Sequence, residues 1–225
     1  MKLNNKRKGI KFGGLLVLAV IIMMGAISVY AENTSNEITS NVVRLHVLAN
    51  SNSDADQALK LKVRDKVVEY LNIELTGSKS ADESLTKISE RLKKIETLSN
   101  ETLANEGSKF KAVAVIGNFD FPVKSYGNIT LPSGNYRALR IIIGEGVGAN
   151  WWCVLFPPLC FVDASTAKVS EPGLEELKGS VSAETFKVIS EGQDGALDIK
   201  VKFKIVDIFE QAKSKIQKQL GNLFK

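Results

Sequence analysis

The chain has 225 residues, 44% of them hydrophobic, which is enough for one medium-sized domain whose core needs no metal or disulfide. Its formal net charge is +5, but positions 1–31 contain five basic residues and no acidic residue. The rest of the chain therefore has equal numbers of acidic and basic side chains. This balance excludes a nucleic-acid-binding protein, which needs a sustained basic surface.

The N-terminus has the pattern of a targeting segment. A basic head is followed by 18 uncharged, mostly apolar residues from Phe12 to Val29, and Val29-Tyr30-Ala31 resembles a cleavage site. The apolar stretch is also borderline in length for a retained membrane helix. Residues 1–31 are thus predicted to be a signal peptide or an N-terminal membrane anchor, and residues 32–41 a flexible tether. The rest of the chain is expected outside the cytoplasm, with membrane contact only through the N-terminal segment.

A strand and two amphipathic helices are predicted to open the folded part. Val42–Ala49 alternates in the manner of a strand. Ser53 or Asp54 can cap the helix that follows, and these residues lack the spacing of a calcium-binding loop. Leucines and isoleucines at intervals of three and four predict a second long helix between Ser80 and Gly107, where the glycine can end it.

From Lys109 the period changes to two, which predicts a sheet. Tyr126–Leu131 and Tyr136–Ile143 flank a Pro-Ser-Gly-Asn turn signal and are predicted to form a β-hairpin. Residues 164–195 are Ser-, Glu- and Gly-rich, which favours a surface excursion with one or two short helices. Leu197–Ile205 alternates strictly and precedes an amphipathic C-terminal helix.

These elements predict the α+β class. We expect a single domain over residues 42–225, with a mostly antiparallel sheet, two long amphipathic helices after the first strand and a C-terminal helix.

The stretch Tyr136–Asp163 contains both cysteines, both tryptophans and a double proline. In an exported chain, Cys153 and Cys160 favour a disulfide, because Pro157-Pro158 between them can turn the chain back. Two reduced thiols buried between strands remain the alternative. Structural zinc normally needs four protein ligands, and only His46 could join the cysteines, so no metal site is predicted.

Catalytic motifs are absent from the sequence. His46 is the single histidine, and no G-x-S-x-G or H-E-x-x-H motif occurs. The GEGVG run leads into Asn150-Trp151-Trp152 rather than into a helix start, so it does not fit a phosphate loop. No catalytic residue and no cofactor are therefore predicted. A cysteine–histidine hydrolase built from His46 with Cys153 or Cys160 is the remaining enzymatic alternative.

Two blocks of sequence resemble one known family. The first block, Arg44–Asp65, reads RLHVLANSNSDADQALKLKVRD, and the second block, Tyr136–Asp163, reads YRALRIIIGEGVGANWWCVLFPPLCFVD. Both resemble the stage II sporulation protein R family of endospore-forming bacteria, over about residues 42–210, so the domain is expected to be of the sporulation R type. The resemblance implies a forespore protein that is exported into the space between two membranes, secreted or anchored there, and that activates a membrane-bound aspartic-type protease of the mother cell. That protease matures a precursor sigma factor.

A protein ligand of this kind would bind through a few aromatic and arginine side chains. The candidates for partner contact are Arg137, Trp151, Trp152 and Phe156. Further motif residues have no assigned role: Arg44, His46, Asn50, Asp65, Arg140 and Asn150. The alternatives are an exported hydrolase and a cell-envelope-binding module, either of which would use the region of His46, Cys153 and Cys160.

Overall fold

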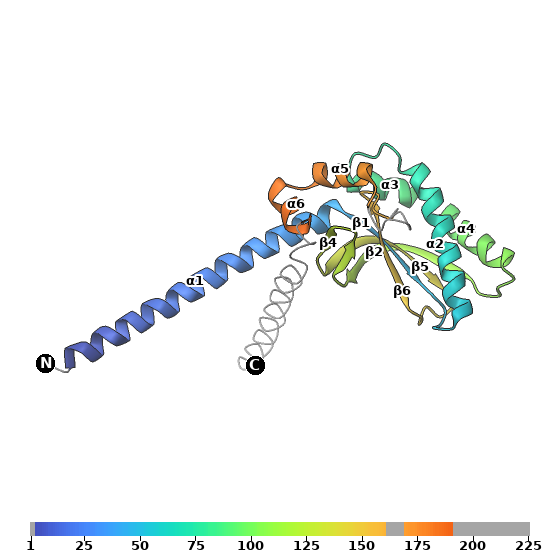
Figure 1. The fold of residues 1–225 in the computed structure, drawn as a ribbon. Coiled ribbons are helices and arrows are strands. Elements are labelled where there is room, and N and C mark those ends of the chain that lie inside the picture. Colours follow the sequence, from blue (N-terminus) through green and yellow to red (C-terminus); the bar gives the residue numbers. More distant parts are fainter. Residues whose placement is uncertain (1–2, 161–168, 191–225) are drawn as a thin grey trace, which may run out of the picture. The chain divides into compact units, whose positions relative to one another are not determined.

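The computed structural model describes residues 3–160 and 169–190 (Figure 1). Residues 37–160 and 169–190 belong to one compact unit, which contains every strand described below. Its elements follow a long N-terminal helix: α1 Leu3–Asn41, β1 Val43–Leu48, α2 Asp54–Glu74, α3 Ala81–Glu90, α4 Leu92–Asn105, β2 Ala112–Phe121, β3 Lys124–Tyr126, β4 Ile129–Leu131, β5 Gly134–Ile143, β6 Asn150–Phe156, α5 Glu171–Ser180 and α6 Ala183–Ser190.

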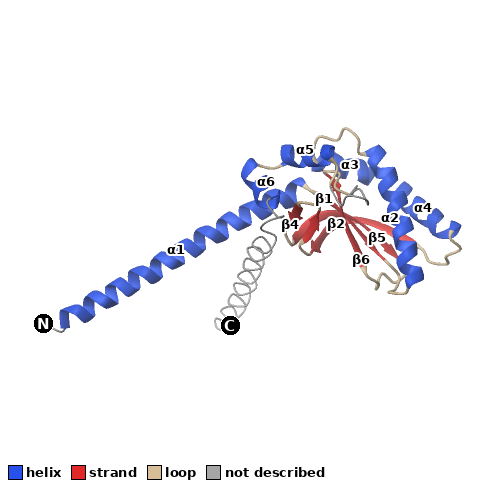
Figure 2. Cartoon of the chain, in the orientation of Figure 1, coloured by secondary structure: helices blue, strands red, loops and turns tan. Residues whose placement is uncertain are grey.

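A four-stranded sheet forms the centre of the unit, in the order β2-β5-β1-β6. The β2–β5 and β1–β6 pairings are antiparallel, whereas β1 and β5 are parallel. The predicted α+β class with a mostly antiparallel sheet is therefore confirmed, with one parallel pairing (Figure 2). The predicted strand over Leu197–Ile205 and the C-terminal helix lie outside the described residues.

The sheet has a core on each side. On one face, Leu45, Val47 and Ile141 pack against apolar residues of α2, α3 and α4. On the other face, a second core gathers around Tyr136 and Val154, with contributions from β3, β4, α5 and α6. Because side chains alternate along a strand, β1 sends Val43, Leu45 and Val47 into the first core and Arg44 and His46 to the opposite face.

Side-chain caps start the helices where the sequence predicted. Ser53 accepts a hydrogen bond from the Asp56 backbone N–H at the start of α2, and Ser80 accepts from that of Glu83 at the start of α3. The second predicted helix is divided at Arg91, whose backbone leaves helical geometry between α3 and α4. The last helical turn of α4 precedes Gly107, as expected.

The predicted hairpin of Tyr126–Leu131 with Tyr136–Ile143 is wrong. The chain turns earlier, at Gly127 with φ 55°, so that β3 and β4 form a small two-stranded sheet. Strand β5 instead lies between β2 and β1, which buries both of its edges. Long-range pairing with two strands outweighed the local turn signal at Pro132.

Residues 32–41 also differ from the predicted flexible tether, because they are the last turns of α1. Ile38 is fully buried in the second core, and Glu37 accepts hydrogen bonds from Ser182 and Thr185. The end of α1 is therefore fixed to the domain. Among the residues whose side chains the structure describes, 22–160 and 169–190, no helix has the length and hydropathy of a membrane span.

Candidate functional site

The two motif blocks meet at the centre of the sheet. Strand β1, from the first block, is parallel to β5 and antiparallel to β6, both from the second block. His46 therefore has Arg140 as its neighbour in β5 and Trp152 as its neighbour in β6. The residues that carry the family resemblance thus form one continuous structure across three strands.

His46 uses its ring face and both of its nitrogens. Its ring stacks on Trp152 with 3.7 Å between centroids. Arg140 Nε donates to Nδ1 at 3.1 Å, so Nδ1 is unprotonated and Nε2 carries the hydrogen that is donated to Asn150 Oδ1 at 2.8 Å. Burial lowers the pKa of His46 to about 4, with Arg140 and Arg44 as additional repelling charges. The imidazole is therefore neutral at physiological pH.

Arg44 lies in an aromatic cage and is fully buried. Its guanidinium carbon is 4.2 Å from the ring centre of Phe121 and 4.8 Å from that of Tyr136, and Nη2 donates to the Tyr126 hydroxyl at 2.5 Å. Burial raises the pKa of both tyrosines, so both phenols remain protonated. Within residues 3–160 and 169–190, no carboxylate pairs with Arg44 and its Nη1 has no hydrogen-bond partner. Cation–π contact is thus the main compensation for its charge.

The glycine turn of the second block is fastened to the loop after β1. The Glu145 backbone N–H donates to Asn50 Oδ1 at 3.1 Å, and that of Ala149 donates to Asn52 Oδ1 at 2.7 Å. Gly148 approaches so closely that a Cβ there would lie 2.2 Å from the Ser51 carbonyl oxygen. The turn therefore packs against a neighbouring loop, and its glycines have a steric reason.

Asp56 completes this loop from the first turn of α2. It accepts hydrogen bonds from Ser51 Oγ at 2.6 Å and from Asn50 Nδ2 at 2.8 Å, and these bonds lower the pKa of its carboxyl. No group of three metal-ligating side chains occurs among the described residues. Asn50 has its role here, as a bridge between the glycine turn and α2.

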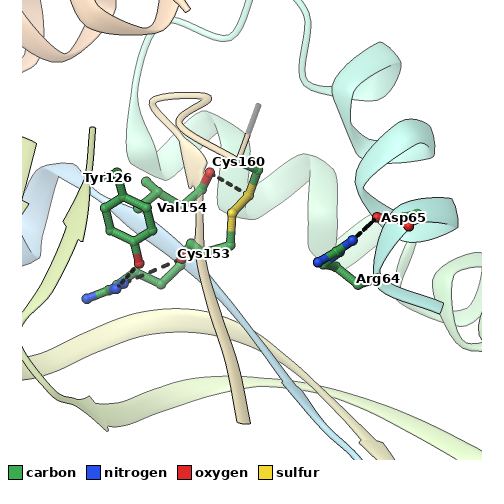
Figure 3. Close-up of a disulfide and its surroundings, with 7 residues drawn as sticks. Arg64, Asp65, Tyr126, Cys153, Val154 and Cys160 are labelled. Carbon is green, nitrogen blue, oxygen red and sulfur yellow. Dashed lines mark hydrogen bonds and ion pairs between the residues drawn. A yellow bond between two sulfur atoms is a disulfide. The ribbon is translucent and has the colours of Figure 1, made fainter. Parts of the chain in front are cut away.

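The structure contains a disulfide between Cys153 and Cys160, with 5.4 Å between the Cα atoms (Figure 3). Cys153 is buried in the first core, and Cys160 follows the double proline, where its sulfur lies 2.9 Å from the Val154 carbonyl oxygen. The bridge therefore fixes the chain that leaves the end of β6. The sulfurs in this form are not available as thiolate nucleophiles.

Replacing Cys153 and Cys160 together by alanine is expected to lower the free energy of unfolding by about 2.5 kcal/mol, the chain-entropy contribution of so short a loop. Urea titration followed by tryptophan fluorescence measures this, since both tryptophans lie in β6. A reducing agent should destabilise the wild-type chain by the same amount and leave the double variant unchanged. Equal stability of the oxidised and reduced wild-type chain would contradict the prediction.

A pocket of about 240 Å³ lies beside the disulfide. The end of α2, the Pro158–Cys160 turn and Glu176 of α5 line it, whereas His46 does not. Cys160 and the single imidazole therefore do not face a common cavity, as a cysteine–histidine hydrolase would require.

The other predicted contact residues are distributed over the domain. Trp151 is 36% exposed, on the helix-covered side, with the Arg64 guanidinium 4.1 Å from its ring centre. Asp65 pairs with Arg64 at 2.5 Å (Figure 3). Arg137 pairs with Asp82 and donates to the Ser40 carbonyl oxygen. Phe156 is 2% exposed and lies inside the first core. Only Trp152 lies beside His46.

Sequence reasoning missed the aromatic residues that surround the two arginines. The ring centre of Phe119 lies 3.7 Å from the guanidinium carbon of Arg140. Phe121 forms an edge contact with Trp152, with 4.7 Å between the ring centres. The alternation of Phe119 and Phe121 in β2 is the signal that could have placed them on one face of the sheet. The fold and this site together define a disulfide-linked α+β domain built around buried arginine–aromatic contacts.

Comparison with known proteins gives the family. The family model described as Stage II sporulation protein R matches residues 39–166. A protein named Stage II sporulation protein R, from Bacillus subtilis (strain 168), is 38% identical over 161 residues, which cover 72% of this chain and 71% of that protein. No solved structure matches the chain. The chain therefore belongs to the stage II sporulation protein R family.

Proposed function

We propose that this protein is an exported signalling ligand that activates a membrane-bound, aspartic-type protease of the mother cell, which then matures a precursor sigma factor. Membership of the stage II sporulation protein R family supports this proposal. Under this proposal, the protein acts by binding the extracytoplasmic face of the protease and catalyses no reaction itself.

One observation carries the proposal: the side chains that a hydrolase would need already have structural contacts. Both ring nitrogens of His46 are engaged, by Asn150 and Arg140, and its pKa is lowered to about 4. Both cysteines are consumed in the disulfide. Because a general base must be available to a nucleophile, these groups support a ligand better than an enzyme.

The proposed location is the space between the forespore and mother-cell membranes, where the protein is secreted or held by its N-terminal segment. The basic and apolar pattern of residues 1–31 supports export. The disulfide agrees with an oxidising compartment outside the cytoplasm.

A pull-down between the full-length chain and the detergent-solubilised protease tests the proposal. We expect direct binding with a Kd below tens of micromolar, the range of weak specific complexes. Processing of the precursor sigma factor should persist in a variant with both Cys153 and Cys160 replaced by serine, in proportion to its folded fraction. Absence of binding at tens of micromolar, or processing that requires a cysteine thiol of a fully folded chain, would reject the ligand proposal.

A further inference from the structure

One half of the sheet face that carries His46 lacks a covering helix among the described residues (Figure 1). The second core covers the half next to Arg44. On the other half, His46 is buried beneath Trp152, but the side chains around it are at least partly exposed, and Val113 is 49% exposed. We name this half the open face and define it by six residues: Val113, Val115, Phe119, Arg140, Ile142 and Trp152.

The register of the strands places these residues together. Val113 is paired with Ile142, and Val115 with Arg140, between β2 and β5. Trp152 reaches the same face from β6, because it stacks on His46, which is the partner of Arg140 in β1. The open face is thus a continuous, largely apolar surface with one formal charge among its six residues. Such a surface on a soluble domain marks an interaction site.

Arg140 is held in a fixed orientation on this surface. Its guanidinium lies over Phe119 at 3.7 Å, and Nε donates to His46 Nδ1 at 3.1 Å. No carboxylate of residues 3–160 and 169–190 pairs with it. Nη1 and Nη2, which have no hydrogen-bond acceptor in that part of the chain, therefore form a prepositioned pair of donors. A planar donor pair of this kind matches a carboxylate.

The helix-covered side has a different electrostatic character. Three of the four basic side chains of α2 are paired with carboxylates: Lys62 with Glu106, Arg64 with Asp65 and Lys66 with Glu69. The fourth, Lys60, is buried and donates to Gln57 and to the Ala149 carbonyl oxygen. The outer edge of β2 is also occupied, since Asn100 bonds both backbone groups of Ala112. A partner therefore finds an unpaired cation on the open face, whereas the cations of α2 are either paired with carboxylates or buried, and this part of the β2 edge is blocked.

We propose that the open face is the docking surface for the protease, and that Arg140 binds a carboxylate that the protease presents among apolar side chains. This proposal rests on the proposed function. Trp152 and Phe119 supply the apolar area, and the contact excludes water from the Arg140–carboxylate pair, which strengthens it. Arg140 is thus a specificity-determining residue, and its hydrogen bond to His46 Nδ1 orients it.

Binding to the detergent-solubilised protease is the first measurement. Arg140→Gln should weaken binding by the full-length chain at least about tenfold, the usual result of breaking a desolvated charge pair. Arg64→Gln is the matched control, because Arg64 also stacks on an aromatic ring, 4.1 Å from Trp151, but lies on the opposite side of the sheet. It should change binding less than about twofold, because Arg64 lies outside the proposed contact. Equal losses in the two variants would overturn the proposal.

Photo-crosslinking is the second measurement and leaves Arg140 in place. A photoreactive amino acid is substituted for Val113 on the open face, or for Ile73 on α2, which is 71% exposed. In sporulating cells, the chain substituted at Val113 should form an adduct with the tagged protease that is lost with Arg140→Gln, and the chain substituted at Ile73 should form none.

The outcomes separate the two proposals. An adduct from Ile73 but not from Val113, or protease binding without any adduct, overturns the docking surface and leaves the proposed function. An Arg140-dependent adduct from Val113 with a different envelope protein supports the surface and rejects the protease as its partner. An adduct within one chain, or with a second copy of this chain, overturns the docking surface. If the protease shows no binding and no adduct forms, both the docking surface and the proposed function are rejected.

Discussion

Replacing Arg44 by alanine is expected to lower the free energy of unfolding by about 3–5 kcal/mol, the usual cost of emptying a large buried site. The side chain is 0% exposed and contacts the rings of Phe121, Tyr136 and Tyr126. Its removal leaves a cavity between these rings and also removes the hydrogen bond that Arg44 Nη2 donates to the Tyr126 hydroxyl. Urea titration of the full-length chain measures the loss.

Arg44→Met separates the volume of this side chain from its charge. Methionine fills most of the space and makes favourable contacts with aromatic rings. It also removes a buried charge that no carboxylate of the described residues neutralises. We therefore expect Arg44→Met to cost no more than about 2 kcal/mol, mainly for the Tyr126 hydroxyl left without its donor. A loss as large as that of Arg44→Ala would show instead that the cation–π contacts dominate.

Local signals were sufficient for the elements that depend on nearby residues. The alternation of Val43, Leu45 and Val47 predicted β1, and the Ser53 cap predicted the start of α2, because both patterns are set within a few residues. The break at Arg91 had no such signal. Apolar spacing continues through it, and the arginine is instead paired with Glu74 from another helix.

The position of β5 and the burial of Arg44 depend on long-range contacts, which local sequence patterns do not reveal. A turn signal at Pro132 favoured a hairpin of neighbouring segments, but β5 pairs with β2, which precedes the small β3–β4 sheet, and with β1, which lies far earlier in the chain. The same limit applies to the site. A charged residue in a strand is usually exposed, and Arg44 is buried only because aromatic side chains from β2, β3 and β5 converge on it. No spacing in the sequence brings those four segments together.

The motif residues are therefore explained first by architecture. Asn50 and Gly148 join the two blocks through the loops, while Arg44 and the disulfide fix the opposite end of β6. This support holds His46 and Trp152 in one arrangement across β1 and β6. A rigid support of this kind reduces the entropy lost on binding, which is what a docking surface needs.

Stability is expected to fall as the pH is lowered from about 6.5 to about 4, because His46 is neutral in the folded state. Its pKa is about 4 in the fold and 6.5 in the unfolded chain, so in this window only the unfolded chain binds the proton. Above pH 6.5 neither state is protonated and the full stability is present. The loss at the acid end is about 3 kcal/mol, from 1.36 kcal/mol per pKa unit.

Protonation would also place a third positive charge beside Arg140 and Arg44 and remove the acceptor at Nδ1. The matched control is His46→Gln, which does not titrate. We expect urea titrations at intervals between pH 4.5 and 7 to show that the free energy of unfolding of the wild-type chain rises with pH, with a flatter profile for the variant. Carboxyls whose pKa is lowered, such as that of Glu96, affect stability mainly below this range. Parallel profiles would mean that folding does not lower the pKa of His46, and below that pKa Arg140 would lack the acceptor that orients it on the open face.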